Sequence, residues 1–153
     1  MNTKGVFSHE TDNWKTPKRL FDTFMNKGFR DCFPFLSEED EFQKNYFGEK
    51  LFINPPYSKM GGVIEWTISQ AANNTIFLLI PARTDTRYFR KLIDELGHKL
   101  TIFFLQGRLK FNDSKNSAPF PSMIIAISDN IIYPQTFSVF TEEEFIKELE
   151  TYF

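Results

Sequence analysis

One short stretch, residues 75–80, constrains the fold of this 153-residue chain more than any other. It reads Thr-Ile-Phe-Leu-Leu-Ile and is bounded by Asn74 and Pro81. A continuous apolar run of this length is typical of a strand buried on both faces, and such strands form the middle of parallel sheets covered by helices. We therefore expect residues 75–80 to lie at the centre of an α/β sheet.

Strand and helix patterns alternate along the chain. Strands are expected within 29–35 and at 50–53, 100–105 and 123–127; helices are expected at 17–27, a short one at 38–43, and along the apolar-periodic segments 63–71, 88–96 and 145–149. The expected helix N-caps are Thr16, Ser37, Asp85 and Thr141, because their side chains can accept a hydrogen bond from a free backbone N–H. Strands that alternate with helices need crossover connections, which predicts a mostly parallel sheet.

The length of the chain fits one domain, expected over residues 14–153. Residues 1–13 are polar and lack apolar periodicity, so we expect a flexible amino-terminal arm. No segment has the pattern of a signal peptide or the ~20 apolar residues of a membrane span, and Cys32 is the only cysteine. These features predict a cytoplasmic protein without a membrane partner. His9 and His98 lie far apart, so we expect no metal site.

The net charge of −2 and the pI of about 5.7 argue against binding to nucleic acid through bulk electrostatics. Any contact with DNA must therefore be local. Basic residues do cluster at 83–91 and 108–115, while acidic residues gather at 38–41 and 142–144. One face can thus be positive, although solvated helix faces explain such clusters equally well.

The tetrapeptide Asn54-Pro55-Pro56-Tyr57 follows the expected strand 50–53, at the sheet edge where ligands of open α/β folds bind. The Asn54 side-chain oxygen and the Pro55 carbonyl can accept hydrogen bonds from an exocyclic amino group, and Tyr57 can stack on the base that carries it. The two prolines fix the direction of the carbonyl. A rigid turn with a buried tyrosine is the alternative, and similar loops serve enzymes that methylate amino groups of RNA bases or of protein glutamine.

Five segments in order resemble the phage-type DNA N-6-adenine methyltransferase family. They are Trp14-Lys15-Thr16-Pro17, residues 51–58 around the tetrapeptide, Pro81-Ala82-Arg83-Thr84-Asp85-Thr86, Gly107-Arg108-Leu109-Lys110-Phe111 and Ala118-Pro119-Phe120-Pro121-Ser122-Met123. The resemblance implies a small, Rossmann-like class I methyltransferase fold. It also implies S-adenosylmethionine as the cofactor and the N6 amino group of adenine in DNA as the methyl acceptor.

By the same resemblance, Trp14, Thr16 and Pro17 match the amino-terminal cofactor motif of the family. Asp31 and Cys32 fall where the family has a short strand end near the cofactor. The chain lacks a Gly-x-Gly there, and glycine usually lets the backbone approach the cofactor. Only residues 32–53 separate Asp31 from the tetrapeptide, so we expect a sheet trimmed by two strands on this side.

Arg83 and Arg87 suit contacts with DNA phosphates. Arg108, Lys110 and Phe111 are expected in a DNA-facing hairpin, with Phe111 or Phe120 beside the flipped base; packing in the core is the alternative for both phenylalanines. The leading hypothesis is a site-specific DNA adenine methyltransferase. A nucleic-acid-binding protein or DNA mimic that has lost catalysis is an alternative of a different class, favoured by the small size, the acidic balance and the absent glycine loop.

Overall fold

The structure is a computed structural model that describes residues 14–130 and 136–153. The expected flexible arm over residues 1–13 lies outside the described residues.

Six strands form one sheet in the order β1-β2-β3-β5-β4-β6. Their bounds are Arg30–Cys32 (β1), Lys50–Ile53 (β2), Thr75–Pro81 (β3), Leu100–Leu105 (β4), Ser122–Ile127 (β5) and Phe137–Phe140 (β6). β5 is antiparallel to both of its neighbours, whereas the other pairings are parallel. The sheet is thus mostly parallel, as expected, and β3 lies inside it with six of its seven residues buried.

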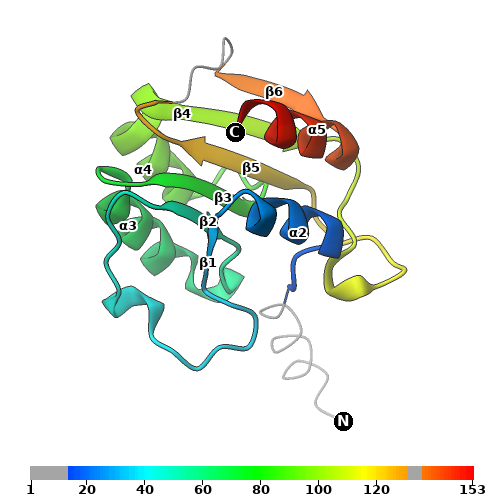
Figure 1. The fold of residues 1–153 in the computed structure, drawn as a ribbon, viewed down its shortest axis with the longest axis horizontal. Helices are drawn as coiled ribbons and strands as arrows, with labels where there is room; N and C mark the ends of the chain where they lie inside the picture. Colours follow the sequence, from blue (N-terminus) through cyan, green and yellow to red (C-terminus); the bar gives the residue numbers. More distant parts are fainter. Residues whose placement is uncertain (1–13, 131–135) are drawn as a thin grey trace.

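Two helices cover each face of the sheet (Figure 1). The first pair is α2 (Lys18–Asn26) and α5 (Glu142–Tyr152), and the second is α3 (Met60–Ala71) and α4 (Arg87–Leu96). Phenylalanine rings dominate the core under α2 and α5, where Phe24, Phe52, Phe77, Phe103 and Phe145 are fully buried. Much of the high phenylalanine content is therefore core packing.

Three of the four expected N-caps, Thr16, Ser37 and Asp85, are wrong. Thr141 caps α5 in a complete capping box, as expected. Helix α4 is capped by Thr86 rather than Asp85, and the short 3-10 helix Glu41–Gln43 by Asp40 rather than Ser37. An N-cap must directly precede the first helical residue, so a helix that begins one or more residues later than its pattern suggests takes a later cap.

The two edges of the sheet are short. Among the described strands, β1 pairs only with β2, and the connection 33–49 between them contains one 3-10 helix and no further strand. This agrees with the expectation that the sheet lacks two strands here. Strand β6 was not expected, because it has only four residues and none of them is buried. Its pairing with β4 defines it.

Candidate active site

Four parallel strands bring their carboxyl ends to the same edge of the sheet. Asp31 is the middle residue of the short strand β1. Asn54 directly follows β2, Arg83 follows β3, and Arg108 follows β4. This edge is where open α/β sheets bind their ligands. The structure therefore places chemically useful side chains from distant segments at the expected binding edge.

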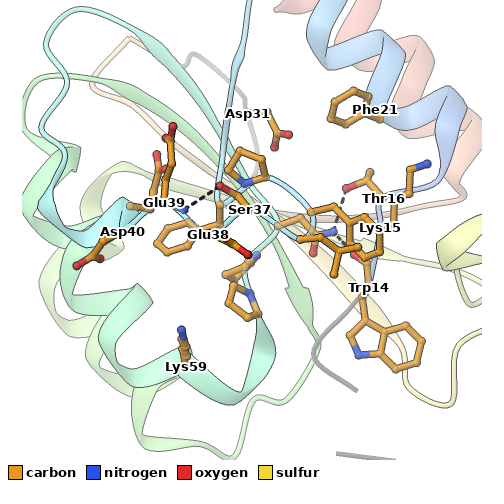
Figure 2. Close-up of a pocket in the computed structure, with 18 of the residues that line it drawn as sticks. Trp14, Lys15, Thr16, Phe21, Asp31, Ser37, Glu38, Glu39, Asp40 and Lys59 are labelled. Carbon is orange, nitrogen blue, oxygen red and sulfur yellow. Dashed lines mark hydrogen bonds between the residues drawn. The ribbon is translucent and has the colours of Figure 1, made fainter. Parts of the chain in front are cut away.

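A cavity of about 1110 Å³ opens at this edge, on the β1 and β2 side. Figure 2 shows Trp14, Lys15 and Thr16 on one side of it and Ser37 to Asp40 on the opposite side. The cavity gathers six of the residues expected to hold the target base or the cofactor: Trp14, Thr16, Asp31, Asn54, Pro55 and Pro56. The remaining expected residues do not line it.

The side chain of Asn54 is held by three hydrogen bonds. Its Nδ2 donates to the Trp14 carbonyl oxygen at 2.6 Å and to Thr16 Oγ1 at 2.9 Å. Its Oδ1 accepts from the Tyr57 hydroxyl at 2.9 Å. Because a backbone carbonyl can only accept, the Trp14 oxygen fixes which end of the amide faces it. The Asn54 oxygen therefore points away from residues 14–16.

Tyr57 is half-buried between the two core clusters, and its ring meets Phe120 edge-on at 5.7 Å. Burial raises the pKa of its phenol well above the ordinary value, so the hydroxyl stays protonated and can donate to Asn54. In this arrangement the hydroxyl of Tyr57 occupies one acceptor position of the Asn54 oxygen, and a carbonyl oxygen has a second lone pair available.

Thr16 is not the N-cap of α2. The helix begins at Lys18, its N-cap is Pro17, and no side chain caps it. The hydroxyl of Thr16 instead accepts from Asn54, and Thr16 and Pro17 are both buried. A proline at the cap cannot offer an acceptor side chain, so the first N–H groups of α2 are left without a side-chain partner.

The carboxyl group of Asp31 faces the cavity from the end of β1. Burial raises its pKa to about 6, and the negative charge of nearby Glu41 adds to the rise. Glu41 is 3% exposed and accepts a hydrogen bond from the Tyr46 hydroxyl at 2.8 Å. Cys32 has no exposed surface, lies in the core, and has a thiol whose pKa burial raises. Its side chain does not line the cavity.

The cavity carries more negative than positive side chains. Among the described residues, seven carboxylates line it (Asp22, Asp31, Glu38, Glu39, Asp40, Glu41 and Asp113) against three lysines (Lys15, Lys18 and Lys59). Residues Ser37–Asp40, which we call the acidic wall, are all exposed. A site with this surplus of carboxylates favours a ligand that bears positive charge and hydroxyl groups.

The residues expected to contact DNA divide into two groups. Arg83, Arg87, Arg108 and Lys110 are exposed beyond the ends of β3 and β4. Phe111 and Phe120 are only 2% and 8% exposed, and their rings pack against Trp14 at 5.6 and 5.1 Å. In this structure the two phenylalanines support the side of the cavity rather than face solvent.

The expected hairpin is present, but a long connection joins its two strands. Strands β4 and β5 are an antiparallel pair, and Arg108, Lys110 and Phe111 lie in the long connection 106–121 between them. The connection contains one 3-10 helix, Phe111–Asp113. The basic residues thus lie on a loop rather than on the paired strands.

Sequence reasoning missed Lys15, Glu41 and Asn112. Lys15 contacts Asn112 through its backbone, and Glu41 is buried beside the cavity. The adjacent polar pair Asn112-Asp113 was the one signal available, because asparagine and aspartate adopt positive φ more readily than most residues. Nothing in the sequence showed which segment this turn would contact.

Two kinds of feature are absent from the described residues. Within residues 14–130 and 136–153, no three side chains of His, Cys, Asp or Glu are grouped so that they can hold a metal ion. Over the same residues, no helix has the length and apolar character needed to cross a membrane.

Comparison with known proteins adds one finding. Residues 4–148 match the family described as DNA N-6-adenine-methyltransferase (Dam), which is nearly the whole chain. A search of curated proteins found no match. The family match covers all the segments that form the cavity and its rim. The chain therefore belongs to the DNA N-6-adenine-methyltransferase (Dam) family, a family of DNA-modifying enzymes with DNA as substrate.

Proposed function

We propose that this protein transfers the methyl group of S-adenosylmethionine to the N6 amino group of adenine in DNA, with the flipped base held by Asn54, Pro55, Pro56 and Tyr57. The orientation of the Asn54 amide carries the proposal. With its nitrogen committed to residues 14 and 16, its oxygen is the group left to accept a hydrogen bond from a ligand. An amide oxygen beside a fixed proline carbonyl matches the two N–H groups of an adenine.

Methyl transfer to the N6 amino group needs hydrogen-bond acceptors more than it needs a general base. The lone pair of the N6 nitrogen is delocalised into the ring, and two N–H hydrogen bonds favour the tetrahedral form that is nucleophilic. Asn54 Oδ1 and the Pro55 carbonyl supply these bonds at fixed positions, which is stabilisation by preorganised dipoles. Tyr57 replaces the stacking lost when the base leaves the duplex. The proton released afterwards passes to solvent or to a nearby polar group.

The donor set of the cavity fits S-adenosylmethionine. When bound, this cofactor supplies an activated methyl group on a sulfonium. Asp31 would hold the ammonium group, and the exposed carboxylates of the acidic wall would accept hydrogen bonds from ribose hydroxyls. The first N–H groups of α2, beside Thr16 and Pro17, would bind the carboxylate. Cys32, the residue after Asp31, pairs with Ile53 of β2 and so helps to hold this end of β1 in place.

The position of the cavity supports a Rossmann-like methyltransferase fold. It lies beyond the carboxyl ends of parallel strands in a sheet with helices on both faces. A DNA substrate also fits the cytoplasmic location expected from the sequence, which is the host cytoplasm for a phage protein.

DNA binding would use local positive charge. Arg83, Arg87, Arg108 and Lys110 are exposed at the rim and suit phosphate contacts, which position a duplex without reading its sequence. Phe111 and Phe120 would act indirectly, because both rings pack against Trp14 and Phe120 also contacts Tyr57. The acidic cavity would then receive the cofactor while the basic rim receives the DNA.

The test is methyl transfer by the purified protein from labelled S-adenosylmethionine to DNA, RNA and a glutamine-containing peptide. We expect N6-methyladenine in DNA alone, and about a 10²- to 10³-fold loss of kcat in Asn54→Ala, the range for losing one preorganised electrostatic contact. Asn26→Ala, an exposed residue at the end of α2, is the matched control. Transfer to RNA or peptide, or full activity in Asn54→Ala, would refute the proposal.

A calorimetric titration separates the degenerate alternative. A folded protein that binds no S-adenosylmethionine or S-adenosylhomocysteine would favour a nucleic-acid-binding protein without catalysis. Sequencing of methylated bases in DNA from cells that express the chain would test site specificity. One methylated sequence context is expected, and random adenine methylation would argue against a site-specific enzyme.

A further inference from the structure

The connection 106–121 touches the catalytic amide through a short chain of hydrogen bonds. Asn112 Oδ1 accepts from the backbone N–H of Lys15 at 2.6 Å, and the backbone N–H of Asn112 donates to the Lys15 carbonyl at 2.9 Å. A single residue thus takes both backbone polar groups of a residue 97 positions away. Figure 1 shows this connection, in yellow, beside the start of α2.

The residues on either side of Lys15 are the two that hold Asn54. The Trp14 carbonyl and the Thr16 hydroxyl both accept from Asn54 Nδ2. No helix or strand includes residues 14–16, so their position depends on such contacts. Asn112 holds Lys15, the residue between Trp14 and Thr16, in place. The orientation of the Asn54 amide then depends on where Trp14 and Thr16 lie.

The backbone of Asn112 is shaped for this contact. Its φ of 60° and ψ of 25° lie in the left-handed region, and Asp113 follows with φ of 54°. Asparagine tolerates this region better than most residues do. The ion pair between Lys15 Nζ and Asp113 at 3.7 Å joins two exposed side chains and adds little. The side-chain oxygen of Asn112 is therefore the specific element of the contact.

We propose that Asn112 is a positioning residue for methyl transfer: it holds residues 14–16 where the Trp14 carbonyl and the Thr16 hydroxyl orient the Asn54 amide toward the target base. This inference rests on the proposed function. It also links the amide to the loop that carries Arg108 and Lys110, so the basic rim and the catalytic oxygen share one mechanical connection.

Two substitutions separate the side-chain oxygen from the backbone shape. Asn112→Gly keeps the left-handed conformation and removes the acceptor. Asn112→Asp keeps an acceptor at the same place and also tolerates positive φ. We expect kcat to fall about 10- to 100-fold in Asn112→Gly, because small misplacements of reacting groups cost that much. Asn112→Asp should retain most of the activity.

A purely structural role would behave differently. The thermal midpoint of Asn112→Gly should stay within about 5 °C of the unchanged protein, since the bond is exposed to solvent. Asn116→Gly, in the same exposed connection, should leave kcat unchanged. Equal losses in Asn112→Gly and Asn112→Asp, or a kcat equal to that of the unchanged protein in Asn112→Gly, would overturn the proposal.

One measurement does not depend on activity. In ¹⁵N NMR spectra, the side-chain NH₂ signals of Asn54, assigned by their loss in Asn54→Ala, should move and broaden in Asn112→Gly and stay in place in Asn112→Asp and Asn116→Gly. Unmoved signals in Asn112→Gly would show that Asn112 does not orient the amide. If the unchanged protein transfers no methyl group to DNA, the proposed function fails while these signals still decide whether Asn112 positions Asn54.

Discussion

The two sides of the cavity are held by different kinds of contact. On one side, hydrogen bonds to Asn54 join residues 38 and 40 positions apart, and Lys15 is bonded to a residue 97 positions away. On the acidic wall, the side-chain bonds made by Ser37 and Asp40 reach only two residues along the chain. Long-range bonds fix tertiary position, whereas local bonds survive when a loop moves as a unit.

The difference follows the chemistry proposed for each side. The Asn54 side must present an oxygen in one direction, because the reacting nitrogen tolerates little misplacement. The acidic wall needs only to offer carboxylates to ribose hydroxyls, which several arrangements satisfy. Leu36, 66% exposed with φ of 58°, shows that the second side also accepts an unfavourable backbone. A substitution should therefore cost more on the Asn54 side.

After Asn54→Ala, the largest effect is expected at Tyr57. Tyr57→Ala removes both the ring proposed to stack on the base and the hydroxyl bonded to Asn54, so kcat/KM for DNA should fall about 100-fold. Tyr57→Phe keeps the ring and should cost less than about tenfold. Kinetics on both variants, with circular dichroism to check folding, make the test. Equal losses in the two would assign the effect to the hydroxyl and contradict stacking.

The next effect is expected at Asp31, where the fixed sheet meets the acidic wall. Asp31→Asn removes the carboxylate proposed to hold the ammonium group, so the Kd of S-adenosylmethionine should rise about 10- to 100-fold by calorimetry. Asp94→Asn, on the exposed surface of α4, is the control and should leave the Kd unchanged. An unchanged Kd in Asp31→Asn would remove Asp31 from the site.

The same variant should be more stable. Burial raises the pKa of Asp31 from the usual 3.8 to about 6, so the folded protein binds this proton more tightly than the unfolded chain does. Stability therefore falls as pH rises from about 4 to 6, and the penalty persists at pH 7. Asp31→Asn should raise the free energy of unfolding at pH 7 by about 1–3 kcal/mol in urea titrations. A less stable variant would contradict this.

The affinity for S-adenosylmethionine should also depend on the charge of Asp31, and therefore on pH. Above pH 6 the Asp31 carboxylate is charged and the Kd should be flat; below it, protonation removes the attraction and the Kd should rise, at most about tenfold per pH unit. The dependence should vanish in Asp31→Asn. Calorimetry between pH 5 and about pH 7.5 measures both. A Kd that stays flat through pH 6 in the unchanged protein would assign the ammonium group to another residue.

How much of the site the sequence predicted also differs between the two sides. Asn54 and the strand before it were predictable because an apolar strand, a chemically specific tetrapeptide and the sheet-edge rule agree at one place. The start of α2 was not predictable, because threonine is a favourable N-cap residue and yet Thr16 bonds to Asn54, a residue 38 positions away. Local propensity cannot rank such a tertiary partner against a helix end.

The fold shows the same limit. The buried strand β3 and the N-cap Thr141 are indicated by short-range patterns, and both predictions are confirmed. Strand β6 exists through its pairing with β4, and Asn112 matters through its contact with Lys15. Neither partner is visible in a local window of sequence.

The smallest effect is expected on the acidic wall itself. The double variant Glu38→Gln with Glu39→Gln removes two exposed carboxylates that line the cavity, and Lys44 already pairs with Glu39. Exposed charges are screened by water and salt, so the Kd of S-adenosylmethionine should rise by less than about fivefold. The difference should shrink as salt is raised to about 0.5 M, where the screening length is only a few ångströms.

The outcome of that titration decides what the acidic wall does. A small, salt-sensitive change means that the wall attracts the cation and that Asp31, held by the sheet, supplies the specific contact. A loss as large as that of Asp31→Asn, retained at high salt, would mean that the carboxylates of Glu38 or Glu39 bind the cofactor at fixed positions. The two sides of the cavity would then be equally ordered when the ligand is bound, and the contrast between them would belong to the free protein alone.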